Sequence, residues 1–195
     1  MALEKSNSFN NGESGFSLIE VMVATGLLVT ALVTLAQLFV ISTRSNIGSH
    51  NTTYASVLAE QKLEELRALA WGYDTQGLPL SDTTTNTAVT PETPTGGTGL
   101  TPSPSTALQS NTTGYVDYVD QFGNKLGTGQ NPPQQAIYTR RWSITPLPTN
   151  PNNTLVIQVL VTPLANELAR VASQFTRTRM LGDSLLVSVK TRKAS

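Results

Sequence analysis

A long apolar run near the start of the chain limits what this sequence can fold into. Phe16 to Ile41 spans 26 residues and carries one charged side chain, Glu20. About 20 apolar residues, rising about 1.5 Å each, are enough to cross a bilayer as a helix. A carboxylate inside such a segment costs at least about 2.5 kcal/mol if it stays unpaired. We therefore interpret 16–41 as a transmembrane segment in which Glu20 has a functional role.

Two simpler interpretations of this run are a signal peptide and a plain membrane anchor. A secretory signal peptide has a basic first region, an apolar core of about 7–15 residues and a small-residue cleavage site after it. The run here is longer than such a core, and polar residues precede it. A plain signal-anchor helix with an incidental glutamate is the other interpretation. In that case Glu20 would only favour the positive end of the helix dipole, worth about 0.3–1 kcal/mol.

The residues around the start of the run carry a family resemblance. Gly15-Phe16-Ser17-Leu18-Ile19-Glu20, followed directly by an apolar helix, resembles the processing site of type IV prepilins and type II secretion pseudopilins. The resemblance implies a leader peptide at 1–15, cut by prepilin peptidase between Gly15 and Phe16, and N-methylation of Phe16. It also implies that Glu20 pairs with the Phe16 amine of a neighbouring subunit during filament assembly.

The apolar helix is predicted to continue as an amphipathic half, 42–73. Its apolar positions recur at helical spacing, and they are Ala55, Leu58, Ala59, Leu63, Leu66, Leu69, Ala70 and Tyr73. We place the charged residues on the opposite face, among them Lys62 and a Glu64–Arg67 pair at i, i+3 spacing. The predicted helix runs from about Ser17 to Ala70, is loosened around Ser45–Ser49, and has Gly72 as its C-cap.

Two further regions follow the helix. Residues 74–113 form a Thr-, Pro- and Gly-rich variable loop that lacks the apolar residues needed to offset its ordering entropy. Its threonines and serines would allow O-glycosylation. From 114 to 195 the pattern indicates an antiparallel β-sheet, with strands at Tyr115–Val119, Ile137–Ile144, Leu155–Val161 and Leu185–Val189. A turn is predicted at Gln121–Lys125, and 165–175 is left open as a short helix or a loop.

The fold class expected from these regions is α+β. A long N-terminal helical spine, transmembrane in its first half, packs its amphipathic half against a small C-terminal antiparallel sheet. Leu155, Ile157, Val159 and Val161 share one face of a strand that is apolar enough to be central, with one face on the core. Tyr138, Arg140, Trp142 and Ile144 share one face of the strand before it. The resemblance implies the pilin fold, and the Arg140–Ile144 strand followed by Leu155–Val161 is similar to PilV-like minor pilins.

Composition argues against most kinds of active site. The chain has 195 residues, no cysteine, one histidine and a formal net charge of zero, which excludes thiolate chemistry and the usual zinc sites. His50 lies in a polar stretch and is predicted to be solvated. Asp117, Asp120 and Asp183 are a weak calcium candidate. We predict no catalytic residue, cofactor, metal or nucleic-acid site. The basic residues near the C-terminus are expected to be solvated, and they are Arg177, Arg179, Lys190, Arg192 and Lys193.

The function expected from the resemblance is structural and not enzymatic. A minor pilin or pseudopilin would reside in the bacterial inner membrane as a single-pass protein, then in the periplasm or a cell-surface filament. Its partners would be other pilin or pseudopilin subunits, prepilin peptidase, the inner-membrane assembly platform and, before assembly, membrane lipid. The alternative is a single-pass membrane-anchored extracytoplasmic binding or adhesion module.

Overall fold

A long helix dominates the computed structural model, which describes residues 15–173 and 179–192. This helix, α1 (Leu18–Ala68), runs without a break through Ser45–Ser49, so the predicted loosening there is wrong. The chain divides into two compact units, Met1–Ser45 and Asn46–Ser195, each described by itself below. Together with the antiparallel sheet of the second unit, α1 confirms the α+β class.

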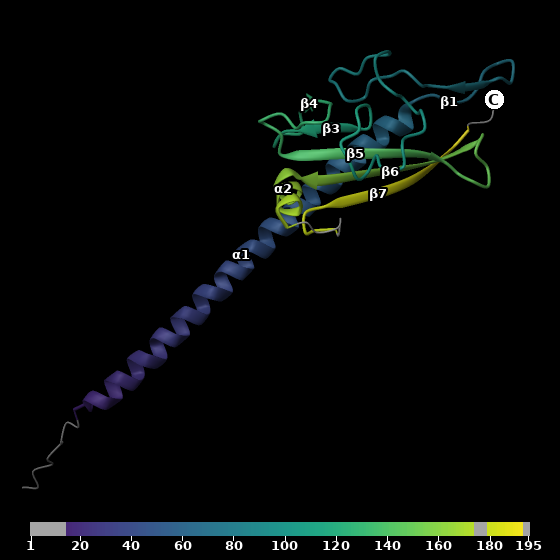
Figure 1. Cartoon of the computed structure of the whole chain (residues 1–195). Coiled ribbons are helices and arrows are strands. Elements are labelled where there is room, and N and C mark those ends of the chain that lie inside the picture. The colour runs from purple at the N-terminus through teal and green to yellow at the C-terminus, as the bar shows by residue number, and fades with distance from the viewer. Residues whose placement is uncertain (1–14, 174–178, 193–195) are drawn as a thin grey trace, which may run out of the picture. The chain divides into compact units, whose positions relative to one another are not determined.

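The second unit is built on a five-stranded antiparallel sheet with the strand order β4-β3-β5-β6-β7 (Figure 1). Its strands are β3 (Val116–Val119), β4 (Lys125–Gly127), β5 (Tyr138–Pro146), β6 (Thr154–Pro163) and β7 (Ser184–Thr191). β5 and β6 pair over nine residues, from Tyr138 opposite Pro163 to Pro146 opposite Leu155. The four predicted strands are therefore confirmed, and the predicted turn at 121–125 connects β3 to the short strand β4.

The core of this unit lies between the sheet and the end of α1. Ala55, Leu58, Ala59, Leu63 and Leu66 of the helix are buried in one cluster with the inward side chains of β5 and β6. Trp142, Ile144, Leu155, Ile157, Val159 and Val161 are all at most 1% exposed, so the residues predicted to share a strand face lie on the buried face of the sheet. The amphipathic stripe is thus confirmed as the element that covers the sheet.

Three details of the predicted helix are wrong. α1 ends at Ala68, so Ala70 is exposed and Gly72 is not its C-cap. Gly72 lies instead in β1 (Trp71–Tyr73), which pairs with β2 (Pro79–Ser81) as a small hairpin. Lys62, predicted on the solvent face, is completely buried, because it has an acidic partner on the sheet that the helical pattern cannot reveal.

The segment predicted as a loop, 74–113, contributes to the core. Thr87, Ala88, Leu100 and Ala107 are buried, and β2 lies within the segment. Asn86 and Thr93 exchange backbone hydrogen bonds in an isolated bridge. The expectation that this stretch buries too little to order itself is therefore wrong, because its few apolar residues pack against a larger core built by other elements.

The stretch left open at 165–175 begins as a helix, α2 (Leu164–Ser173), which lies at the end of the sheet where β7 starts (Figure 1). Among the basic residues near the C-terminus, Arg179 is exposed, as predicted. Lys190 and Arg192 are half-buried and donate hydrogen bonds to backbone carbonyls, so the prediction of solvated side chains is wrong for both. Arg177 and Lys193 lie outside the described residues.

Candidate functional site

The predicted processing motif lies at the start of α1. Gly15, Phe16 and Ser17 precede the helix, and the carbonyl of Ser17 accepts backbone hydrogen bonds from Glu20 at 3.0 Å and Val21 at 3.2 Å. Phe16 is 82% exposed. A Cβ added at Gly15 would meet no heavy atom within 4 Å, so folding itself does not require glycine there. Residues 1–14 of the predicted leader lie outside the described residues.

Glu20 is exposed in the first turn of α1. Its carboxylate makes no hydrogen bond or ion pair with any residue in the part of the chain that the structure describes. Together with Phe16, Val21, Ala24, Thr25 and Leu28, it borders an open groove of about 420 Å³ along one side of the helix. Glu20 is therefore an acid on an apolar surface, with no partner among the described residues.

No part of residues 15–45, the described portion of its unit, covers the first half of α1. Every residue from Leu18 to Ile41 is exposed, and α1 is the one helix among the described residues that is long and apolar enough to cross a membrane. Its threonine hydroxyls are satisfied locally, since Thr25 donates to the Val21 carbonyl at 2.8 Å and Thr30 to the Gly26 carbonyl at 2.9 Å. The segment therefore presents few unsatisfied polar groups to an apolar solvent.

The second half of α1 is tied to the sheet by a buried charge cluster. Lys62 Nζ donates to Asp117 Oδ2 at 3.0 Å, and to the carbonyl and hydroxyl of Thr87 at 2.7 and 2.9 Å. Arg140 donates from Nε and Nη2 to the two oxygens of Asp117, at 2.7 and 2.9 Å. Because all three donor sites of the Lys62 ammonium have an acceptor, its contacts fit the protonated form.

Electrostatics in this cluster favour an ionised Asp117. Burial disfavours the charged carboxylate, but Lys62 and Arg140 outweigh that effect and hold the pKa of Asp117 below its usual value of 3.8. Burial also lowers the pKa of Lys62, with Asp117 opposing the shift. Lys62 Nζ further lies 4.0 Å from the centre of the Trp142 ring, a cation–π contact.

A second lysine extends the cluster toward the loop segment. Lys125 Nζ lies 3.0 Å from Glu65 Oε2 and 3.7 Å from Glu92, and donates to the Thr87 carbonyl at 2.8 Å. Glu65 Oε2 is also 3.4 Å from Lys62 Nζ. Sequence reasoning missed this cluster. Two signals were available: Lys62 lies four residues from both Leu58 and Leu66, and Arg140 shares a strand face with Trp142 and Ile144.

The weaker site candidates are not brought together. Asp117 is occupied by Lys62 and Arg140, and Asp183 pairs with Arg170, so neither carboxylate is free for calcium. The described residues contain no group of three His, Cys, Asp or Glu side chains placed to hold a metal ion. His50 is exposed, as predicted. No family model, curated protein or solved structure gives a significant match to the chain.

Proposed function

We propose that this chain is a minor pilin or pseudopilin, a structural subunit of a type IV pilus or of a secretion pseudopilus. The observation that carries the proposal is the exposed apolar first half of α1, Leu18 to Ile41, whose single carboxylate, Glu20, lies in the first turn after Gly15-Phe16. Such a helix has two apolar environments available: lipid before assembly, and the helices of neighbouring subunits afterwards.

Charge balance explains what Glu20 does in this proposal. Cleavage after Gly15 leaves a positive α-amino group on Phe16, about one helical turn from the carboxylate. In a medium of low dielectric constant each charge alone is costly, and the two attract strongly. Because Glu20 has no partner among the described residues, the amine of a neighbouring subunit neutralises it and sets the axial position of the incoming subunit.

The rest of α1 supports close packing between subunits. A Cβ added at Gly26 would meet no heavy atom of this chain within 4 Å, so the chain's own folding does not explain the glycine. Small residues let helices approach closely in apolar surroundings. The buried Lys62–Asp117–Arg140 cluster fixes the second half of the helix to the sheet, so axial force on the helix reaches the folded unit through ionic contacts as well as apolar ones.

Processing is tested at Gly15. In a bacterial host with a prepilin peptidase, the native chain should be recovered from membranes with Phe16 as its methylated first residue, identified by intact-mass spectrometry. Gly15→Val should accumulate the uncut precursor, and Gly26→Ala, a change within the same unit, should be cut normally. Recovery of the native chain with residues 1–15 attached would contradict the proposal and favour a membrane-anchored binding module.

Assembly is tested separately at Glu20. Glu20→Gln keeps the shape of the side chain but removes its charge, so it should be processed normally while entering sheared filaments about tenfold less, or worse. Glu60→Gln, an exposed glutamate farther along α1, is the matched control and should assemble as the parent does. Equal incorporation of the two variants would refute the role given to Glu20.

A further inference from the structure

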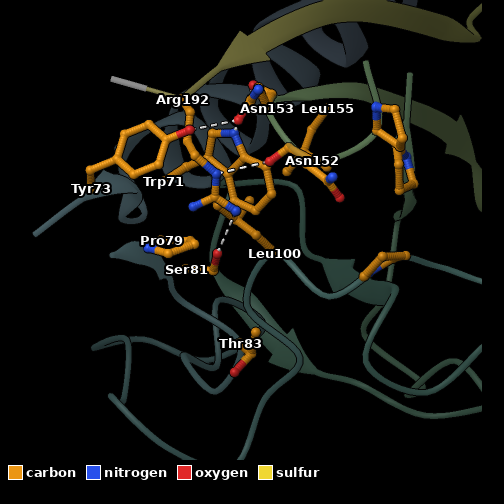
Figure 2. A pocket seen from close by; sticks show the side chains of 13 residues that line it. Trp71, Tyr73, Pro79, Ser81, Thr83, Leu100, Asn152, Asn153, Leu155 and Arg192 are labelled. Carbon is orange, nitrogen blue, oxygen red and sulfur yellow. Dashed lines mark hydrogen bonds between the residues drawn. The ribbon is translucent and has the colours of Figure 1, made fainter. Parts of the chain in front are cut away.

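An open cavity lies at the end of the sheet formed by the β5–β6 turn. Its volume is about 440 Å³, within the range of small-molecule sites. The hairpin of β1 and β2, the segment near Leu100, the β5–β6 turn and the residue after β7 all contribute walls (Figure 2). Among the described residues that line the cavity, Arg192 is the only charged one, so their charge is positive.

Arg192 is held by a cation–π contact and four hydrogen bonds to neighbouring residues. Its guanidinium carbon lies 3.7 Å from the centre of the Trp71 ring. Nε donates to the Asn152 carbonyl at 2.9 Å, Nη1 donates to the Gly72 and Leu80 carbonyls at 2.9 Å each, and Nη2 donates to the Ser81 hydroxyl at 3.1 Å. Within residues 15–173 and 179–192 no acidic side chain pairs with it, so its positive charge acts on whatever occupies the cavity.

The aromatic walls are fixed before any ligand binds. Trp71 Nε1 donates to the Asn153 carbonyl at 3.4 Å, and the Tyr73 hydroxyl donates to Asn153 Oδ1 at 2.7 Å (Figure 2). Four proline rings add rigid apolar surface, and these are Pro79, Pro102, Pro146 and Pro151. A site whose side chains are already ordered loses little conformational entropy on binding.

We propose that this cavity binds an acidic saccharide unit, a six-membered sugar ring that bears a carboxylate. Four of the five N–H groups of Arg192 donate to the chain, so the remaining Nη2 N–H and the positive charge would attract the carboxylate. Arg192 covers one face of Trp71, and the proline rings with the uncovered aromatic surface match the apolar C–H face of a sugar ring. The Asn152 carboxamide is exposed and makes no hydrogen bond to the described part of the chain, so it is free to bind sugar hydroxyls.

The local hydrogen bonds favour a saccharide over an extended peptide. A peptide strand would need backbone acceptors along the cavity, but those of Gly72, Leu80 and Asn152 are already used by Arg192. The Asn153 carbonyl accepts from the Trp71 indole and from the backbone N–H of Arg192. Side-chain amides and hydroxyls are the polar groups that remain, and these suit sugar hydroxyls. This inference does not depend on the proposed filament role.

The chain contains two tryptophans, which provide a direct readout. The full chain in detergent micelles, labelled with 5-fluorotryptophan, should give one ¹⁹F NMR signal from Trp71 and one from the buried Trp142. Titration with oligogalacturonate should move the Trp71 signal and leave the Trp142 signal unchanged. A neutral galactose oligosaccharide of the same length should bind about tenfold more weakly, because it lacks the charge-assisted contact to Arg192.

Three variants assign the contacts. Arg192→Gln should remove the preference for the acidic sugar, and Asn152→Ala should weaken binding without changing the thermal midpoint. Arg67→Gln removes an exposed positive charge outside the cavity lining and should bind as the parent does. A thermal melt of each variant shows whether it is folded.

Four results would overturn the assignment. They are a Trp71 signal that no saccharide moves at millimolar concentration, equal affinity for the acidic and the neutral sugar, the same response to acetate alone, and a response to an acidic proline-rich peptide in place of the saccharide. Free galacturonate and polygalacturonate, titrated in parallel, distinguish recognition of a soluble acid from recognition of a polymer.

Discussion

Replacing Asp117 by Asn removes the carboxylate that Lys62 and Arg140 share in the core. None of the three side chains has exposed surface, so water cannot solvate the two cations once the carboxylate is removed. Breaking a buried ion pair from one side costs about 3–5 kcal/mol, since the remaining charges stay desolvated. The amide of Asn also presents an N–H group to a donor where the carboxylate had only acceptors. We expect Asp117→Asn to lower the free energy of unfolding by about 4 kcal/mol.

The effect is large enough for a simple assay. In a domain of about 150 residues, 1 kcal/mol shifts the melting temperature by about 2–4 °C, so the variant should melt about 8–16 °C lower. Trp142 lies against Lys62 and reports unfolding by near-UV circular dichroism of the full chain in micelles.

The matched control is Glu64→Gln. It breaks the ion pair with Arg67, in which both side chains are about half exposed, and should cost at most about 0.5 kcal/mol. If Asp117→Asn unfolds within about 1 kcal/mol of the parent, the cluster does not hold the helix to the sheet as we argue.

Two further predictions concern the same unit. The pKa of Asp117 is held below 3.8 in the folded state. The ionised carboxylate therefore contributes its full stabilisation above pH 3.8, and this is lost as the pH falls through the pKa of the folded state. The free energy of unfolding should fall less steeply below about pH 4 in Asp117→Asn than in the parent. Leu66→Ala deletes a fully buried side chain facing the sheet and should cost about 2–5 kcal/mol in urea unfolding, whereas Val57→Ala, at an exposed position of the same helix, should cost less than about 0.5 kcal/mol. Similar costs for these two substitutions would show that the stripe does not form the interface.

Periodicity predicted the parts of the fold in which one physical rule operates over many residues. α1 repeats apolar positions at helical spacing for several turns, and β6 alternates Leu155, Ile157 and Val159 toward the core. In both cases burial of one face sets the pattern, so the sequence alone reveals it. The hairpin of β1 and β2 was missed because each strand has three residues, too short to show an alternation.

The buried cluster could not be predicted because it depends on pairing between distant segments. Lys62, Asp117 and Arg140 come from a helix and two strands, and each residue taken alone is normally expected at the surface. Arg192 was missed for the same reason: its partners in β1, β2 and the β5–β6 turn are distant in the sequence. Local patterns report which face is apolar, but they do not report which polar side chains meet across the core.

The two halves of α1 differ in how their charged side chains are paired, and this difference links the fold to the proposed function. In the first half an acid, Glu20, stands on an apolar surface without a partner among the described residues. In the second half a base, Lys62, is completely buried and has every donor site filled from its own chain. Unpaired charges are costly in apolar surroundings. A charge paired within its own chain therefore stabilises the fold, whereas a charge without such a pair favours binding to a partner. We therefore expect Lys62 variants to fail in folding, and Glu20 variants to fold normally and fail in assembly.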